Sequence, residues 1–541
     1  MHLFRITALS ALIASGFVSA QAAQAAQVPA GTVLAEKQEI VRHIKDEPAS
    51  LDPAKVVGLP EAQVARDLFE GLVNQGADGK PTPGVAQSWQ TTDNKRYVFK
   101  LRENAKWSNG DPVTAYDFVY SWQRLVNPKT LSPFAWFAQM AGIANAEGII
   151  NGQVPVQKLG VAAPDSHTLV VQLNKPVPFF VNLLANFSLF PVPQKTIERY
   201  GNDWTKPENL VGNGAYAMQE RVVNEKIVLK PNPYYWDHKN TVLTKVTFIP
   251  INQESAATKR YLAGDIDITE SFPKNMYHKL MKDIPEQVYT PDQLGTYYYA
   301  FNTQKAPLND ARVRRALSYA IDRQIIAEKV LGTGEKPAYH LTPDVTAGFE
   351  PVPLAIQKMT QAERNKQAKA WLKAAGYGPN KPLKLTLLYN TSENHQKIAI
   401  AVASMWKKSL GAQVKLTNQE WKTYIDSRNT GKFDVVRASW VGDYNEASTF
   451  LTLLTSTHSG NIAKFNSPGY DKLLKQASEE TDAGKRNADY AQAEQILADQ
   501  APIAPIYQYT NGRLIKPWVK GYPITNPEDV AYSQTMYIIK H

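Results

Sequence analysis

The segment 384–440 alternates between strand and helix patterns, and this alternation limits the possible folds more than any other feature. Residues 384–389 (KLTLLY) and 433–440 (FDVVRASW) are rich in strand-forming side chains. Between them, residues 396–410 (QKIAIAVASMWKKSL) are helix-like, and 414–417 (VKLT) form another short strand pattern. Strand–helix–strand units of this size build parallel sheets with ligand sites at the carboxyl ends of the strands. The segment therefore predicts an α/β fold.

Helix and strand patterns continue along the whole chain, whose length requires several domains. At roughly 150 residues per domain, 541 residues correspond to about three or four domains. The chain is 43% hydrophobic and 20% charged, which excludes a disordered, fibrous or polytopic membrane protein. The tail predicts a polar helix over 485–500 and a strand over 536–539. Because the domain borders are weakly marked, we expect the chain to cross between lobes more than once.

The first 25 residues predict a secretory signal peptide. Arg5 forms a short basic region, and Ile6–Val18 is an apolar run too short to cross a bilayer. Small residues follow, and cleavage after Ala25 or after Ala20 fits the small-x-small rule. An uncleaved anchor is the alternative interpretation. With no later apolar run of about 18 residues, we expect an exported protein.

Charge and cysteine content narrow the partners and the chemistry. The formal net charge is +10, and the basic residues are scattered among acidic ones, which is typical of a solvated surface and not of a nucleic-acid binder. There are no cysteines, so disulfides, thiolate metal sites and cysteine nucleophiles are excluded. We therefore expect no nucleic-acid partner.

The motifs of several enzyme classes are absent. The sequence contains no G-x-x-x-x-G-K-[ST] phosphate loop, G-x-S-x-G elbow, H-E-x-x-H pair or S-x-x-K set. Its nine histidines lie far apart and have no metal-ligand spacing. Triads can be assembled from distant segments, so a secreted peptidase or amidase stays open as an alternative. We expect a protein that is not an enzyme and that holds no metal or cofactor.

Eight short segments, taken in order, carry a family resemblance. They are WSNGDPVTA (107–115), DFVYSWQR (117–124), NGAY (213–216), PNPYYW (231–236), AGDID (263–267), DARVRRA (310–316), AIDR (320–323) and WVGDYN (440–445). Together they resemble the peptide-binding class of extracytoplasmic solute receptors (family 5), which serve ATP-driven importers. The resemblance covers essentially the whole mature chain, from about residue 33 to the end.

The resemblance implies a two-lobed α/β fold of the class II periplasmic type, with a two-stranded hinge and an additional inserted domain. Transferred to this sequence, it implies a signal peptide over 1–25, a first lobe over 26–69, 194–294 and 511–541, an inserted domain over 70–193 and a second lobe over 295–510. It also implies a receptor without need of a second copy, so we expect a monomer.

Four charged or titratable residues match the family's contacts to the two ends of a peptide. Asp443 matches the anchor of the ligand's α-ammonium, although alone it would suit an ordinary turn after a strand. Arg428 and Arg437 match residues that meet ligand carboxylates, where the planar guanidinium binds in a bidentate manner and stays charged when buried; each could instead be a surface or structural arginine. His395 matches another position on the carboxylate side, but its place at a helix start also suits a cap.

Aromatic and small residues near these positions complete the expected site. Trp421 and Trp440 match the walls of side-chain pockets, with two core tryptophans as the alternative. Tyr298, in a run of three tyrosines, is expected on the cleft side, and alternation sends its neighbours to the other face. The other candidates, from the anchor segment and from beside the hinge, are Gly442, Ser271 and Phe272.

Several positions depart from the general oligopeptide receptors of the family. Two cysteine positions fall on Gly295 and Val441, an acidic position on Val57, a lysine on Leu331 and a pocket tyrosine on Phe134. The changes remove charge and hydroxyl groups, which makes unrestricted binding of ordinary peptides less secure. Because Val57 stands where those receptors carry an acidic residue, one source of repulsion toward ligand carboxylates is absent, which fits an acidic ligand.

Within the family, the chain most resembles receptors for murein tripeptide (L-alanyl-γ-D-glutamyl-meso-diaminopimelate), partly through VLAEKQ (33–38), NQESAATKRYL (252–262) and SFPKNM (271–276). The resemblance implies a periplasmic receptor that closes on this or a similar short peptide and delivers it to an inner-membrane peptide permease of an ABC transporter. A general oligopeptide receptor is the alternative. A related receptor for a nickel chelate, haem or sugar is a more distant one.

Overall fold

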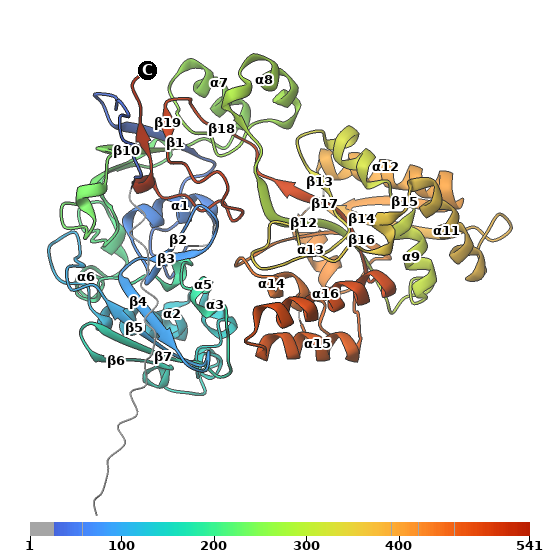
Figure 1. Ribbon diagram of the computed structural model, residues 1–541, viewed down its shortest axis with the longest axis horizontal. Coiled ribbons are helices and arrows are strands. Elements are labelled where there is room, and N and C mark those ends of the chain that lie inside the picture. Colours follow the sequence, from blue (N-terminus) through green and yellow to red (C-terminus); the bar gives the residue numbers. More distant parts are fainter. Residues whose placement is uncertain (1–25, 57, 391, 420, 459) are drawn as a thin grey trace, which may run out of the picture.

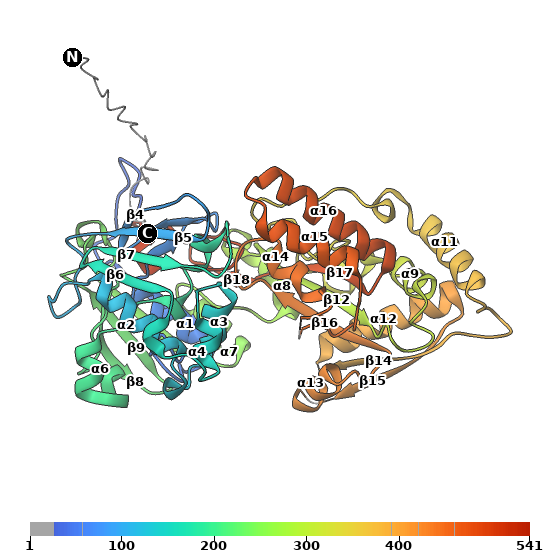
Figure 2. The same ribbon diagram turned by 90° about the horizontal axis from the view of Figure 1, so that it is seen from below.

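The computed structural model describes residues 26–541 except for 57, 391, 420 and 459. The predicted signal segment, 1–25, lies outside these residues. Two lobes lie side by side along the long axis of the molecule, and the turned view separates the same two bodies (Figures 1 and 2). Both lobes combine helices with strands, which confirms the α/β class and the two-lobed architecture. None of the described helices is both long and apolar enough to span a lipid bilayer.

The first lobe is organised around a four-stranded sheet with the strand order β1, β10, β9, β8. The bounds are Glu39–Ile44, Lys245–Pro250, Lys226–Pro231 and Tyr216–Val222. β1 and β10 are parallel although about 200 residues separate them, whereas β10, β9 and β8 form antiparallel pairs. Helix α1 (Leu59–Leu68) leads away from this sheet toward the inserted segment.

A second four-stranded sheet, with the order β4, β5, β7, β6, lies within the segment expected as an inserted domain. The bounds are Ala86–Thr91, Arg96–Leu101, Thr168–Gln172 and Val161–Asp165. Helices α2 (Ala115–Val126), α3 (Ala135–Met140) and α5 (Phe180–Leu183) pack beside it. One continuous hydrophobic core joins the side chains around both sheets. The inserted segment therefore packs on the first lobe as a single body.

The second lobe is built on a six-stranded sheet with the order β13, β17, β12, β16, β14, β15. The bounds are Lys336–Pro337, Ile503–Thr510, Asp292–Phe301, Val435–Val441, Lys384–Asn390 and Gln413–Gln419. β14 is parallel to both β15 and β16, and α12 (Glu393–Leu410) connects β14 with β15. The strands and the helix expected over 384–440 are therefore confirmed, as are the predicted polar helix, α16 (Ala483–Gln500), and the terminal strand, β20 (Tyr537–Ile538).

Two neighbouring strands carry the chain between the lobes. β12 enters the second lobe and β17 leaves it, and Asp292 and Thr510 are partners at the lobe border. Just beyond this border, β11 (Val288–Tyr289) pairs with β18 (Arg513–Leu514). Figure 1 shows these strands crossing between the lobes. This arrangement agrees with the two-stranded hinge expected from the family.

The run of three tyrosines on β12 alternates as expected. Tyr297 and Tyr299 pack in one hydrophobic core of the second lobe with Trp406 of α12, and Tyr298 packs in the other core on the opposite face. On the same strand, Gly295 is the register partner of Val441 on β16. These are the two positions at which the general receptors carry cysteines. Their direct pairing supports the residue-by-residue match along β12 and β16.

Candidate ligand-binding site

Asp443 lies two residues beyond the carboxyl end of β16, on a turn held from both sides. The N–H of Gly442 donates to the carbonyl oxygen of Leu294 (2.8 Å), and the N–H of Asp443 donates to Thr449 Oγ1 (3.1 Å). Thr449 belongs to the short helix α14 (Ser448–Leu451). The turn is therefore fixed to β12 on one side and to α14 on the other, and it presents the Asp443 side chain at a defined place.

Gly442 is required at this turn by close approach. A Cβ atom at this position would lie 2.6 Å from Leu294 Cδ2, 2.9 Å from Leu294 Cγ and 3.1 Å from Thr449 Cγ2. Carbon atoms meet favourably at about 3.5–4.0 Å, so any side chain would displace the turn or β12. Gly442 thus positions its neighbour.

The Asp443 carboxylate is reachable by solvent yet surrounded by protein on most sides. This surrounding protein removes part of its hydration, which raises the pKa of Asp443 to about 6. No ion pair in the described part of the chain includes Asp443, and no cation contributes to its pKa shift. A carboxylate in this state gains most from a cation that arrives with a ligand.

Arg437 lies on β16 with its side chain almost buried. Its guanidinium donates to Asn390 Oδ1 (3.4 Å) and Tyr509 Oη (3.0 Å), and its carbon Cζ lies 4.8 Å from the centre of the Tyr297 ring. No carboxylate pairs with Arg437 among the described residues, and its Nε is buried without a hydrogen-bond partner there. Because a guanidinium stays charged when buried, Arg437 is a buried cation whose neighbours are neutral.

Arg428, on α13 (Trp421–Asn429), lies near Arg437. Its guanidinium is partly exposed and lies 6.0 Å from the ring of Tyr424, whose hydroxyl donates to the backbone carbonyl of Arg437. Both arginines also act electrostatically on the pKa of Tyr298. Arg428 and Arg437 therefore lie near each other around Tyr424. The Tyr298 side chain, in contrast, packs on the face of the sheet opposite the Arg437 guanidinium. No described carboxylate forms an ion pair with Arg428.

His395 is not the cap of α12, so that alternative is wrong. The cap is Ser392, whose hydroxyl oxygen accepts the N–H of His395 (3.5 Å). The imidazole lies against Tyr297, with Nδ1 3.5 Å from the tyrosine hydroxyl oxygen. Burial, together with the charges of Arg437 and Lys274, lowers the pKa of His395 to about 3. His395 is therefore neutral near pH 7 and can serve a carboxylate only as a neutral N–H donor.

Trp440 is half-buried, and its Nε1 donates to Thr449 Oγ1 (3.4 Å). Alternation along β16 sends Trp440 and Arg437 to opposite faces of the strand, and Trp440 packs beside the core that contains Tyr298. Trp440 thus lies next to the Asp443 turn and apart from Arg437. Of Trp421, only the backbone at the start of α13 is described, and the side chain lies outside the described part of the structure.

Ser271 and Phe272 line a cavity of about 220 Å³ beside the hinge. Lys274, Asn394 and Thr510 are among the other lining residues. Phe272 is 5% exposed and packs in a small hydrophobic core, while Ser271 Oγ donates to Glu254. Because Asn394 immediately precedes His395, this cavity adjoins the basic groups of the second lobe.

Phe134 packs against the core of the first-lobe body. It packs edge-on against Phe187, with ring centroids 5.1 Å apart, and precedes α3, which lies on the side of that body facing the second lobe in both views (Figures 1 and 2). The candidate at Val57 lies outside the described residues.

Sequence reasoning missed three side chains at the site. Lys274 acts on His395 electrostatically and pairs with Glu335 (2.7 Å). Tyr509 accepts a hydrogen bond from Arg437, and Glu528 lies near enough to Asp443 for the Asp443 charge to raise the pKa of Glu528. Lys274 stood inside a quoted family segment, so its charge was a usable signal. The other two come from the C-terminal region, where no local pattern predicts contact with β16.

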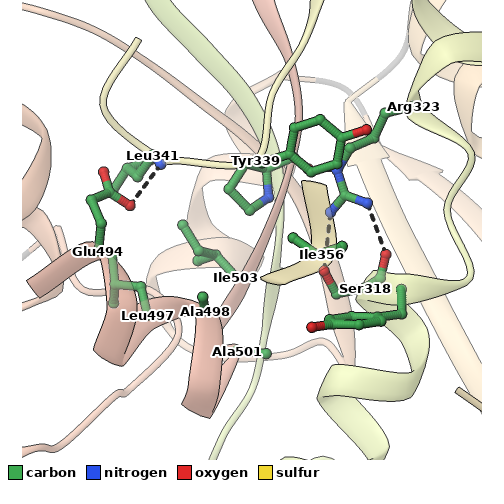
Figure 3. Close-up of a pocket in the computed structure, with 12 residues that line it drawn as sticks. Ser318, Arg323, Tyr339, Leu341, Ile356, Glu494, Leu497, Ala498, Ala501 and Ile503 are labelled. Carbon is green, nitrogen blue, oxygen red and sulfur yellow. Dashed lines mark hydrogen bonds between the residues drawn. The ribbon is translucent and has the colours of Figure 1, made fainter. Parts of the chain in front are cut away.

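A small enclosed cavity in the second lobe has a structural role only. Its volume, about 20 Å³, suits about one water molecule. Arg323 donates there to the carbonyl oxygens of Ser318, Ala338 and Pro505. Glu494 accepts the N–H of Leu341 (Figure 3). Both charged groups are thus satisfied by the fold. Within the described residues, no three His, Asp or Glu side chains are grouped as metal ligands.

The fold and the site define a two-lobed binding protein, with an unpaired carboxylate and a set of unpaired arginines near the meeting of the lobes. The chain belongs to the bacterial extracellular solute-binding proteins, family 5, whose profile for the middle part of these proteins matches residues 80–461.

Individual relatives cover the whole length. The periplasmic murein peptide-binding protein MppA of Escherichia coli is 72% identical over 540 residues, which is 100% of each chain. The periplasmic oligopeptide-binding protein OppA of Salmonella typhimurium is 50% identical over 534 residues, 98% of each chain.

Solved structures also report on the arrangement of the lobes. The unliganded open form of the murein tripeptide-binding protein MppA superposes with a TM-score of 0.88, at 74% identity over 95% of this chain and 99% of that one. Another structure of the Escherichia coli MppA, also 74% identical, gives 0.79 over 94% of this chain and 100% of that one. At equal identity, the chain superposes more closely on the unliganded open form than on the other structure.

Proposed function

We propose that this protein is a periplasmic receptor that captures murein tripeptide, or similar short peptides, between its lobes and delivers them to an ABC-type peptide permease of the inner membrane. The observation that carries the proposal is that one strand and the turn after it present two opposite charges, both without an ion-pair partner in the described part of the chain. Asp443 follows the end of β16 and Arg437 lies within it, and neither has an oppositely charged partner among the described residues. Family membership supports a binding protein that is not an enzyme.

The spacing of these charges suits a short peptide. The chain from Arg437 to Asp443 advances six residues and spans at most roughly 20 Å, at about 3.3 Å per extended residue, because Asp443 lies on the turn after β16. A tripeptide backbone spans roughly 11 Å, and the long side chain of Arg437 can close much of the remaining gap. The ammonium of such a ligand would lie at Asp443 and its carboxylates toward the arginines.

The ligand's charges favour murein tripeptide over neutral peptides. It carries three carboxylates and two ammonium groups, and its γ-linkage displaces one carboxylate sideways. Arg437 and Lys274 supply cations near the neutral imidazole of His395. Lys274 already pairs with Glu335, and Arg428 adds a third cation near Tyr424. Each ligand carboxylate that leaves water needs such a partner, because an unpaired buried charge costs several kcal/mol. The 72% identity to a murein peptide-binding protein points the same way.

Capture would proceed by closure of the hinge. A ligand favours the closed form only if it contacts both lobes, since it shifts the equilibrium by its difference in affinity for the two states. Arg428, Arg437 and His395 belong to the second lobe. From the hinge side of the first lobe, Ser271, Phe272 and Lys274 line a cavity together with Asn394, the residue before His395. We propose that the lobe borders are those given by the family match.

Mass spectrometry of ligand released by denaturing the purified receptor tests this function. The proposal predicts an intact small peptide, with diaminopimelate in its composition when the protein is isolated from the cell envelope. Recovery of cleaved products would indicate a peptidase, and recovery of a metal chelate, haem or sugar would contradict the proposal. A general oligopeptide receptor, supported by the 50% identity to OppA, would instead release peptides of mixed sequence.

A further inference from the structure

A single residue of β12 joins the two segments that carry Asp443 and Glu528. The N–H of Leu294 donates to the carbonyl oxygen of Pro527 (2.8 Å), and the carbonyl oxygen of Leu294 accepts the N–H of Gly442 (2.8 Å). The N–H and C=O groups of one strand residue point to the same edge. The turn before Asp443 and the loop before Glu528 therefore lie side by side, one on the second lobe and one on the tail that returns to the first.

The Glu528 carboxylate is only half satisfied. Its Oε2 accepts a hydrogen bond from Gln75 Nε2, whereas Oε1 is buried without a hydrogen-bond partner among the described residues. Such an atom loses its hydration without compensation when nothing binds it. An unpaired acceptor beside a candidate ammonium anchor has a natural partner in the same ammonium.

The charged groups around Glu528 do not neutralise it. Arg66 of α1 is within electrostatic range but forms no ion pair with it, and Asp529 is already paired with Arg513. Burial raises the pKa of Glu528 to about 8; Arg66 opposes this shift and Asp443 adds to it. The remaining titratable neighbour is Tyr532. Burial raises the pKa of Tyr532 to about 12, so this side chain stays neutral.

The two acids ionise in a defined order. Asp443, with its pKa near 6, loses its proton while Glu528 still holds one, so Glu528 does not affect it. The charge on Asp443 then opposes ionisation of Glu528. Near pH 7, the empty pair therefore carries one negative charge and one proton.

We propose that Glu528 is a second anchor for the ligand's α-ammonium, which it shares with Asp443. This inference rests on the proposed function of Asp443. An ammonium has three N–H donors, and once water is excluded each needs an acceptor. Asp443 alone leaves donors unmatched, and the free Oε1 of Glu528 supplies a further acceptor from the other lobe. Binding by both acids also gives the ligand contacts on both sides of the hinge.

Binding then displaces a proton. The incoming R–NH₃⁺ forms hydrogen bonds to both carboxylates, the Glu528 O–H bond breaks, and the proton leaves to buffer. Near pH 7, a receptor with Glu528 mostly protonated should release close to one proton per peptide bound. A ligand whose amine is acetylated carries no cation, so it should release none.

Isothermal titration calorimetry at pH 7, in two buffers of different ionisation enthalpy, counts these protons. The ligands are murein tripeptide, tri-alanine and N-acetyl-tri-alanine, and the proteins are wild type, Glu528→Gln and Asp443→Ala. Glu479→Gln, at an exposed glutamate on the distant helix α15 (Pro468–Glu479), is the matched control. Glutamine keeps the size of Glu528 and mimics its protonated form.

The expected result is release of close to one proton by wild type and by the control with the free-amine peptides. Glu528→Gln should release almost none and bind those peptides roughly 10- to 100-fold more weakly, with unchanged affinity for the acetylated peptide. The role of Glu528 is overturned if wild type releases no proton, or if Glu528→Gln releases as many protons and binds as tightly as wild type. In either case, a loss of binding in Asp443→Ala would still support the proposed function. If Asp443→Ala also binds normally, the shared anchor and the proposed function of Asp443 fail together.

Discussion

Phe179 and Tyr444 stack face to face, with ring centroids 5.3 Å apart and planes 6° from parallel. Phe179 belongs to the inserted segment of the first-lobe body, whereas Tyr444 directly follows Asp443 on the second lobe. Tyr444 is 7% exposed and packs within the core of the first-lobe body. The turn that carries Asp443 is therefore anchored in the opposite lobe, and the position of the carboxylate depends on this contact.

Replacing Phe179 tests this dependence. An offset or stacked aromatic pair contributes about 0.5–1.5 kcal/mol beyond its buried area, so Phe179→Ala should weaken peptide binding roughly 2- to 10-fold by loosening the turn. Phe179→Leu, which keeps apolar volume, should lose less. Calorimetric titration of both variants measures the effect. Equal affinity of Phe179→Ala and wild type would show that the stack does not position Asp443.

The pH dependence of binding should report Asp443. Only its ionised form attracts an ammonium, and its pKa near 6 means that the empty site is protonated below that pH. Binding must then displace a proton, so the protonation of Asp443 should raise Kd by roughly fivefold between pH 6 and 5, where the ligand's own carboxylates remain ionised.

The same titration on Asp443→Asn is the control. This variant should bind about 10²–10³-fold more weakly at pH 7, because the ammonium loses its charged partner, and should lose the contribution of this group to the slope. A wild-type affinity that is flat between pH 6 and 5 would remove Asp443 from the ammonium site.

The guanidinium shape of Arg437 should matter as well as its charge. Tyr509, Asn390 and the Tyr297 ring hold the fork in one orientation. Arg437→Lys keeps the charge but cannot bind a carboxylate in a bidentate manner, so murein tripeptide should bind at least tenfold more weakly. Arg312→Lys, at an exposed arginine paired with Asp310, is the matched control and should bind normally. Unchanged affinity of Arg437→Lys would assign Arg437 a purely structural role.

Gly442 offers a test of the turn itself. Gly442→Ala would bring a methyl group 2.6 Å from Leu294 Cδ2, and such overpacking costs typically 1–3 kcal/mol. We expect a lower melting temperature and weaker peptide binding. Gly469→Ala, where nothing lies within 4 Å of the added Cβ, should leave both unchanged. If the two variants behave alike, close approach does not constrain the turn.

Much of the second lobe could be predicted from sequence because its signals are local. The strands and helix over 384–440 follow from residue patterns within a few turns of chain, and the tyrosine alternation on β12 follows from the two-residue period. The family segments identify the fold because they contain residues with structural roles. Asp310 and Asp322 cap helices, and Arg323 binds backbone carbonyl oxygens, so these residues are tied to the architecture.

The site itself could be predicted only where the family match supplied it. Asp443, Arg428 and Arg437 were proposed in this way, and both arginines approach Tyr424 in the structure. Contacts between distant segments left no local signal, such as Glu528 with Asp443 or Phe179 with Tyr444. The neutral state of His395 was equally hidden, because it arises from burial beside two cations that neighbouring sequence does not reveal.

Competition between murein tripeptide and tri-alanine for the empty receptor tests the central claim most directly. Both ligands present one alanine ammonium to the acids, but the murein peptide offers three carboxylates to Arg428 and Arg437, whereas tri-alanine offers one. Calorimetric displacement should show one peptide per receptor and a clear preference for the murein peptide. Equal affinities would contradict an acidic-peptide receptor and favour a general one, and failure of both to bind would contradict peptide capture altogether.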